Sequence, residues 1–318
     1  MSIARTLLLR ASRSTWLAEQ FRRRSFARRA VRRFMPGEDL GSALDAAATF
    51  GSSGLGTVVT ALGERVSTRA EAEGVRRHYV DVLDAIAARR LPTHISVKLT
   101  HLGLDVDRAL CLDSVRALAV HAAATGTMLW VDMEESQYVD ATLDLYRAVL
   151  AEHRGVGVCL QAYLRRTPAD LESLLAAGAS IRLVKGAYRE PPDVAFPRKA
   201  DTDAAYLTLA RSMLDSAATN QRQVFGTHDL GLLERVRAHA ASRSLPSNAW
   251  EVHMLYGIEA SAQRALAAGG VSVRVLISYG SHWFPWYVRR LAERPANVWF
   301  VVRSLIPRSS SSSLGTTA

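Results

Sequence analysis

The chain has 318 residues, of which 48% are apolar and 22% are charged, as in ordinary globular proteins. This composition excludes global disorder, a collagen-like fibre and a disulfide scaffold. No apolar stretch approaches the about 20 residues that a membrane span needs. The two cysteines, Cys111 and Cys159, lie far apart and are expected to be small buried side chains.

The formal net charge of +10 is concentrated at the N-terminus, because residues 1–40 hold ten arginines and only three acidic residues. Apolar residues alternate with these arginines at helical spacing, which predicts a basic helical arm. Three interpretations stay open: a solvated helical face packed on the main domain, a peripheral contact with anionic lipid, or a targeting segment. The serine-rich tail at 308–318 is expected to be disordered.

Residues 41–307 are expected to form one domain, in which short β-rich apolar runs alternate with segments of helical period. The predicted strands lie at 57–60, 95–99, 128–131, 156–160, 181–184, 223–225, 250–254 and 271–277. The predicted helices lie at 75–89, 107–125, 138–152, 168–177, 202–218, 230–242 and 259–268, with a final one at 285–293. Eight strand–helix units predict an α/β fold of the (β/α)8 barrel type. A doubly wound sheet usually has fewer strands and a glycine fingerprint for phosphate, which this chain lacks.

Polar residues stand at the carboxyl ends of most predicted strands, where side chains from separate strands converge in such barrels. They are Lys98, Asp132, Gln161, Arg182, Lys185, Thr227, His228 and His253. This convergence predicts the catalytic site at that end of the barrel.

Lysine is scarce in this chain, which has 40 basic residues but only three lysines. Lys98 and Lys185 both follow strand cores, a placement that suggests a need for a compact ammonium group rather than a planar guanidinium. Lys199 lies in a polar loop and is expected to be an exposed residue.

Asp132 is a single carboxylate after an apolar strand and is therefore a candidate for chemistry. Glu134 and Glu135, which follow it, are expected to begin a helix or to face solvent. His228 lies in a Thr-His-Asp sequence that also suits a structural histidine with local hydrogen bonds. No group of His, Asp and Glu residues has metal-ligand spacing, so no metal site is expected.

The final predicted helix carries Arg289 and Arg290 one turn before Glu293, and an aromatic run at 283–287 precedes the arginines. Paired guanidinium groups beside an apolar wall suit the carboxylate of a small apolar substrate.

Taken in order, these motifs resemble the proline dehydrogenase family, in its bacterial single-function form, over residues 30–305. The matching blocks are ISVKL at 95–99, VDMEE at 131–135, LQAYLRR at 160–166, IRLVKGAYREP at 181–191, THD at 227–229, MLYGI at 254–258 and RRLAERPAN at 289–297. The resemblance implies a distorted (β/α)8 barrel with N-terminal helices, a final helix over the barrel mouth and non-covalently bound FAD. It also implies oxidation of L-proline to 1-pyrroline-5-carboxylate in a cytoplasmic enzyme, with electrons passed to a quinone in the membrane it touches.

The resemblance also assigns roles to residues, position by position. It implies an active-site pair of Asp132 and Arg182, with Glu293 steadying Tyr188 or the arginines. The residues implied to bind or surround the substrate are Lys98, Arg289, Arg290, Tyr188, Leu255, Trp286 and Leu276. The residues implied to contact the flavin are Met133, Gln161, Val184, Lys185, Gly186, Thr227 and His228.

Four positions depart from the family pattern, which usually has Tyr at Leu276, Pro at Ser278, Tyr at Trp286 and Gln at His253. Two of them fall on the expected pocket wall, so a close cyclic analogue of proline is an alternative substrate. An enzyme of another class, an aldolase-type barrel with a Schiff-base lysine at Lys98 or Lys185, is a second alternative. A third is an inert barrel whose basic arm binds nucleic acid or lipid, although the nearly balanced charge of the body disfavours it.

Overall fold

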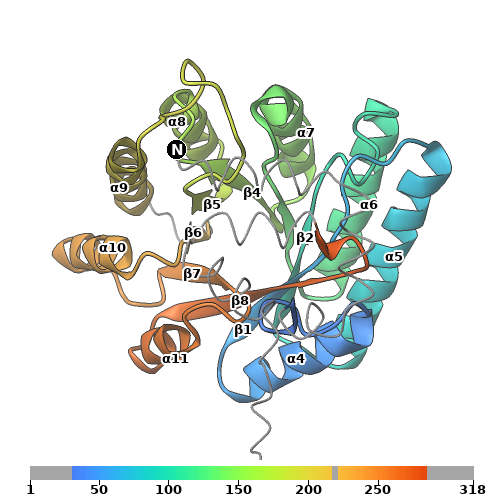
Figure 1. Cartoon of the computed structure of the whole chain (residues 1–318), viewed down its shortest axis with the longest axis horizontal. Coiled ribbons are helices and arrows are strands. Elements are labelled where there is room, and N and C mark those ends of the chain that lie inside the picture. Colours follow the sequence, from blue (N-terminus) through green and yellow to red (C-terminus); the bar gives the residue numbers. More distant parts are fainter. Residues whose placement is uncertain (1–30, 217–220, 285–318) are drawn as a thin grey trace, which may run out of the picture. The chain divides into compact units, whose positions relative to one another are not determined.

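The predicted (β/α)8 barrel is confirmed by the computed structural model of the chain, which describes residues 31–216 and 221–284. Eight parallel strands close into a barrel in sequence order, each pairing with its neighbours and β8 pairing with β1 (Figure 1). Residues 35–281 form one compact unit, and the described residues 31–34 and 282–284 belong to a second one. The predicted helix at 285–293, the tail and the first 30 residues of the arm lie outside the described residues.

The elements keep the order that the sequence predicts, with one strand and one helix alternating along the chain. The strands are β1 (Gly56–Ala61), β2 (Thr93–Val97), β3 (Leu129–Val131), β4 (Val156–Gln161), β5 (Ser180–Val184), β6 (Gln223–Gly226), β7 (Trp250–Leu255) and β8 (Ser272–Tyr279). The helices are α4 (Leu40–Ser52), α5 (Arg69–Ala88), α6 (Arg108–Ala124), α7 (Val139–Glu152), α8 (Thr167–Ala176), α9 (Lys199–Asp215), α10 (Leu230–Ser242) and α11 (Ala260–Ala268), with a short 3-10 helix η1 (Ser136–Tyr138) before α7.

The helix α4 is the element that the sequence pattern did not predict. Its residues are mostly alanine, glycine and serine, although its buried residues Ala43, Leu44 and Ala47 stand at helical spacing. Its start is nevertheless well defined, because the Asp39 carboxylate accepts a hydrogen bond from the backbone of Ser42 at 2.8 Å. Among the described residues, no helix is long and apolar enough to cross a membrane.

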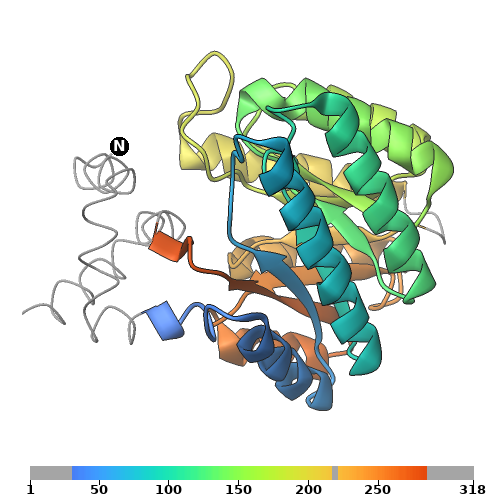
Figure 2. The same cartoon turned by 90° about the vertical axis from the view of Figure 1, so that its right-hand side faces the viewer.

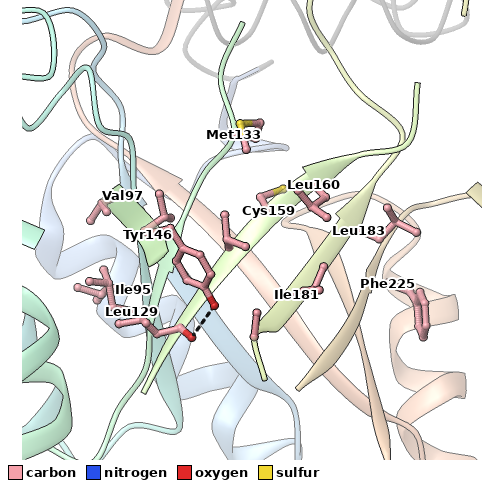
Figure 3. Packing of buried hydrophobic residues seen from close by; sticks show 14 of the residues in the cluster. Ile95, Val97, Leu129, Met133, Tyr146, Cys159, Leu160, Ile181, Leu183 and Phe225 are labelled. Carbon is pink, nitrogen blue, oxygen red and sulfur yellow. Dashed lines mark hydrogen bonds between the residues drawn. The ribbon is translucent and has the colours of Figure 1, made fainter. Parts of the chain in front are cut away.

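The main hydrophobic core lies between the strands and the helices that surround them. Figure 2 shows these helices packed along the outside of the strands. Side chains that point outward from the strands pack there, among them Ile95, Leu129, Ile181 and Leu183 (Figure 3). Both cysteines are buried, as expected from the sequence. This outer core holds the strands in register and so fixes the positions of the strand ends.

A second, smaller apolar cluster fills the inside of the barrel. Its members come from β1, β3, β6 and β8 or stand beside them: Val58, Met128, Trp130, Val224 and the partly buried Leu276. The Trp130 indole needs the space beside Gly157, because a Cβ on that glycine would lie 2.4 Å from the ring. The indole nitrogen donates a hydrogen bond to Nδ1 of His94 at 3.2 Å.

An ion network around Glu251 lies deeper in the barrel. The Glu251 carboxylate accepts hydrogen bonds from Arg222 and from Nε of Arg274, the latter at 3.0 Å. Nε2 of His253 lies 3.4 Å from the same carboxylate, while its buried Nδ1 has no partner among the described residues. Burial lowers the pKa of His253 to about 4, although the hydrogen bond to Glu251 opposes this shift. His253 is therefore neutral in the folded protein at neutral pH.

The pKa of His253 generates a prediction about acid stability. Because an unfolded histidine has a pKa of about 6.5, the unfolded chain binds one more proton than the folded chain between that pH and about 4. The free energy of unfolding should therefore decrease as the pH is lowered through this window, by up to about 1.4 kcal/mol per pH unit for this one proton.

His253→Gln should lose less stability than the natural protein when the pH falls from about 7 to about 5. Urea denaturation of both proteins at the two pH values measures the difference. Equal losses in the two proteins would show that His253 does not carry this proton linkage.

Candidate active site

A buried ion pair between Arg182 and Asp132 joins three strands at the carboxyl end of the barrel. Arg182 points inward from β5, Asp132 follows β3, and the two side chains form a direct hydrogen bond. Ser96 of β2 completes the arrangement, because its hydroxyl lies 2.9 Å from both the Asp132 carboxylate and Nη2 of Arg182. The structure thus brings together two residues that the sequence analysis assigned to the reaction.

The Arg182 guanidinium is fixed on its other side by Trp130, whose ring centre lies 5.2 Å away. This distance is within the range of a cation–π contact. Arg182 is only 2% exposed, so water cannot solvate its positive charge. The carboxylate of Asp132 therefore provides most of the compensation for that charge. Nη1 of Arg182 is buried and has no hydrogen-bond partner among the described residues, so this donor remains available to a bound molecule.

Lys98, which follows β2, forms an ion pair with Glu64. Both side chains are largely shielded, with exposed fractions of 16% and 24%. Glu64 was not among the predicted site residues. It stands three residues after the end of β1, whereas Lys98, Asp132 and Lys185 directly follow their strands. A substrate carboxylate at Lys98 would have to compete with Glu64 for the ammonium group.

The expectation that Glu134 begins a helix or faces solvent is wrong. Glu134 is 1% exposed, and its two oxygens accept hydrogen bonds from the backbone and the hydroxyl of Thr100, at 3.0 and 2.6 Å. Burial raises the pKa of Glu134 to about 6 against the lowering effect of these bonds. The hydroxyl of Thr100 in turn accepts from the backbone of Arg65 at 3.1 Å. Glu134 therefore ties the segment that carries Glu64 to the segment that carries Lys98.

Glu135 behaves differently from its neighbour. Its carboxylate lies at the protein surface and forms an ion pair with Arg65 at 2.6 Å. It also occupies the position just before η1, which agrees with the expected helix start.

Lys185, which follows β5, lies between two carboxylates. Its ammonium group donates to Asp203 at 2.6 Å and to Asp229 at 2.8 Å. Burial alone would raise the pKa of Asp229, but the hydrogen bond and charge of Lys185 outweigh burial and lower it to about 2. Lys199 also contacts both carboxylates, although it is as exposed as the sequence predicts, at 73%. This cluster ties the start of α9 and the start of α10 to the end of β5.

The motif Thr227-His228-Asp229 has a clear structural role at the end of β6. The Thr227 hydroxyl accepts from the backbone of Asp229 at 3.1 Å, and Asp229 caps α10 by accepting from the backbone of Leu232. Nε2 of His228 accepts from the backbone of Leu255 at 2.9 Å, which links the ends of β6 and β7. Because that nitrogen accepts, the neutral His228 ring carries its proton on Nδ1.

The remaining predicted residues within the described part of the chain follow the carboxyl ends of the strands or stand on the strands themselves. Met133, which directly follows Asp132, is buried, and its side chain is labelled in Figure 3. Leu255 closes β7, and Leu276 lies beside it in the register of β8. Tyr188 lies in the segment after β5, while Arg289, Arg290, Trp286 and Glu293 lie outside the described residues.

Two features suit a large planar cofactor at this end. Gln161 is 2% exposed and keeps its Oε1 without a hydrogen-bond partner among the described residues, as Arg182 keeps its Nη1. Gly186 has φ of +113°, and a Cβ there would lie 2.2 Å from the Tyr163 ring. Only glycine therefore lets the backbone pass this close to that ring, which is a contact within the protein. Unpaired buried polar atoms are typical of a ligand site.

Comparison with known proteins gives a consistent result. The sequence model described as "Proline dehydrogenase" matches residues 43–303. Proline dehydrogenase 1 of Bacillus subtilis is 35% identical to this chain over 278 residues, which cover 87% of this chain and 91% of that protein. Proline dehydrogenase of Deinococcus radiodurans is also 35% identical, over 86% of this chain and 89% of that protein.

Among solved structures, proline utilization A from Bdellovibrio bacteriovorus matches with a TM-score of 0.79 at 23% identity. The match covers 89% of this chain and 34% of that one, and it supports the fold alone. Proline utilization A from Bradyrhizobium japonicum matches with a TM-score of 0.69 at 26% identity, over 86% of this chain and 31% of that one.

The ion pair at Arg182 generates a prediction about stability. Asp132→Asn leaves a buried guanidinium without its counter-charge, which should lower the free energy of unfolding by about 3–5 kcal/mol. Ser96→Ala removes one hydrogen bond to each partner but keeps the ion pair, and should cost only about 1–2 kcal/mol. Denaturant unfolding of the three proteins measures both effects. A loss for Asp132→Asn no larger than that for Ser96→Ala would contradict the role given to the pair.

Proposed function

Because this chain belongs to the proline dehydrogenase family, we propose that it oxidises L-proline to 1-pyrroline-5-carboxylate with bound FAD as the first electron acceptor. The ring carbon on the side of the nitrogen away from the carboxylate loses one hydrogen, and the nitrogen loses the other. A carbon–nitrogen double bond forms, and two electrons leave the substrate. The observation that carries the proposal is the Arg182–Asp132 pair, which holds a buried cation with a free donor among polar strand ends.

The residues at the barrel mouth fit FAD. When bound, FAD supplies the two-electron acceptor that protein side chains do not provide. The free Nη1 of Arg182 and the free Oε1 of Gln161 would bind its polar edge, and the backbone at Gly186 would approach it closely. Five further residues are proposed to complete this cofactor site: Met133, Val184, Lys185, Thr227 and His228.

The substrate carboxylate is proposed to bind at Lys98. The ammonium group of Lys98 is already oriented by Glu64 and shielded from solvent, so an incoming carboxylate would replace one anionic partner by another. Arg289 and Arg290 are proposed to hold the same carboxylate as a bidentate clamp, and Tyr188 and Trp286 to surround the ring.

The positive charges at this end also act on the proton of the substrate amine. Oxidation at the carbon beside nitrogen requires the neutral amine, because the ammonium form has no free electron pair. Lys98 and Arg182 disfavour a third positive charge nearby and would lower the pKa of the bound ammonium group. Arg182 would also stabilise negative charge that develops during the reaction, and Asp132 keeps its guanidinium in place for that purpose.

The second acceptor is proposed to be a quinone at the cytoplasmic face of the cell membrane. The support for this step is the family resemblance together with the arginine-rich N-terminus, which suits contact with anionic lipid.

A close cyclic analogue of proline is a second candidate substrate. Leu276 packs with Val58 and Trp130 inside the barrel, so this part of the wall is apolar. An apolar side chain at this position favours unsubstituted rings and rings with an apolar substituent over rings that carry a hydroxyl. The Schiff-base alternative has less support, because Lys98 and Lys185 both donate to carboxylates, whereas a Schiff-base lysine must present a free electron pair.

Anaerobic mixing of the FAD-loaded protein with L-proline tests the proposed reaction. We expect the visible absorption of oxidised flavin to disappear, with one equivalent of 1-pyrroline-5-carboxylate formed per flavin. A panel of cyclic amino acids in the same assay separates proline from its analogues. Failure of the protein to bind FAD, or a bound flavin that none of these compounds reduces, would overturn the proposal.

Removal of the Lys98 charge should weaken substrate binding more than it slows the reaction. For Lys98→Met, we expect the concentration of proline that gives half-maximal flavin reduction to rise about tenfold or more, because one charged hydrogen bond is lost. The limiting rate of reduction should change much less. The control is Arg108→Met, which removes one positive charge at the surface, where Arg108 pairs with Asp144. An unchanged half-maximal concentration in Lys98→Met would exclude Lys98 from the carboxylate site.

A further inference from the structure

A cavity opens at the end of the barrel where the strands begin. Its volume is about 470 Å³, and its wall comes from the end of α5, the start of β2, the end of α6, Arg222 just before β6, and Arg274 of β8. In a parallel barrel this end is remote from the carboxyl ends of the strands. The cavity is therefore separate from the site around Lys98, Asp132 and Arg182.

The wall of this cavity is strongly cationic. It contains Arg90, Arg222 and Arg274 and no aspartate or glutamate. One carboxylate, that of Glu251, lies behind the wall and accepts from both Arg222 and Arg274. The single carboxylate thus faces three guanidinium groups, which leaves an excess of two positive charges at the cavity.

The three arginines differ in how many of their donors are used. Arg274 donates from Nε to Glu251 at 3.0 Å and from Nη1 to the carbonyl of Pro92 at 2.9 Å. Arg222 pairs with Glu251 through Nη1, and its side chain is still 46% exposed. Within the described part of the chain, Arg90 forms no ion pair or side-chain hydrogen bond. Arg90 and the outer face of Arg222 therefore offer free guanidinium donors.

Two local features show that these arginines are held in place at a cost, which is conformational at Arg90 and electrostatic at Arg274. Arg90 has φ of +51°, in the left-handed region that residues other than glycine rarely adopt. This conformation occurs directly after α5, where glycine is the usual residue. Burial lowers the pKa of Arg274, and the neighbouring charge of Arg222 adds to the shift. An anion in the cavity would reduce the repulsion between these cations.

We propose that this cavity binds a small oxyanion, a phosphate or a carboxylate, through the guanidinium groups of Arg90 and Arg222. Arginine matches both ligands, because its planar fork donates two parallel hydrogen bonds to a pair of oxygens. Arg274 contributes charge from behind and is itself positioned by Glu251. His94, which lines the cavity, accepts from Trp130 through Nδ1 and is neutral in the free protein. It can donate to the anion from Nε2.

Titration of the FAD-loaded full-length protein with inorganic phosphate tests this site. Calorimetry at constant ionic strength, with chloride as the balancing anion, should show saturable binding of about one phosphate. A parallel titration with succinate, alone and in the presence of phosphate, establishes whether carboxylates take the same site. Binding of either anion supports the site, whereas the absence of saturable binding by both would overturn it.

A pair of adjacent arginines provides the matched control. Arg90→Gln should weaken anion binding about tenfold or more, because it removes a charged donor from the cavity wall. Arg89→Gln makes the same change in charge one residue away, where Arg89 pairs with Asp45 at 2.7 Å and does not line the cavity. The affinity of Arg89→Gln for phosphate should stay within about twofold of that of the natural protein. Equal weakening by both substitutions would show that the affinity depends on the overall charge of this region and not on a specific donor in the cavity. That result would contradict the proposal.

Discussion

The buried charge of Arg182 is the constraint on which the site at the barrel mouth depends. A guanidinium that is 2% exposed is stable only with a counter-charge and further hydrogen bonds close by. Asp132 supplies the charge, Ser96 supplies a hydroxyl, and Trp130 supplies a ring face. These partners stand on or directly after β2 and β3, while Arg182 stands on β5. The pair therefore holds its geometry only if the barrel is closed and its strands are in register.

The need to pair buried polar groups recurs deeper in the barrel. Trp130 contacts Arg182 and also donates to His94, and His253 packs edge-on against the Trp130 ring and approaches Glu251. Glu251 is in turn held by Arg222 and Arg274. A chain of polar and aromatic contacts thus runs from the Arg182–Asp132 pair to the cationic cavity. Buried polar groups are costly when unpaired, so this continuity restricts which residues the interior accepts.

The fold follows from the sequence to a large extent because parallel strands buried on both faces give continuous apolar runs. Eight such runs separated by amphipathic segments leave few alternatives to a barrel. The same reasoning places Asp132 and Arg182 at one end, and the structure brings them together. Their catalytic roles stay predictions, as does every role assigned to Arg289 and Arg290.

Other features could not be predicted from the pattern, for identifiable physical reasons. Glu134 has the polarity of a surface residue, and its burial depends on two hydrogen bonds from Thr100, which is 34 residues away in sequence. Glu64 lies in an irregular segment without periodicity, and only the folded chain shows that it contacts Lys98. The buried face of α4 consists of Ala43, Leu44 and Ala47, and alanine is only a weak mark of a buried position. In each case the deciding contact is long-range or the local signal is weak.

The most direct measurement is a crystal structure of the FAD-loaded protein with a proline analogue whose ring nitrogen is replaced by oxygen, which prevents oxidation. We expect the analogue carboxylate to contact Lys98 in place of Glu64, while Arg182 keeps its bond to Asp132. An analogue bound away from Lys98, or an Arg182 that has left Asp132, would contradict the account.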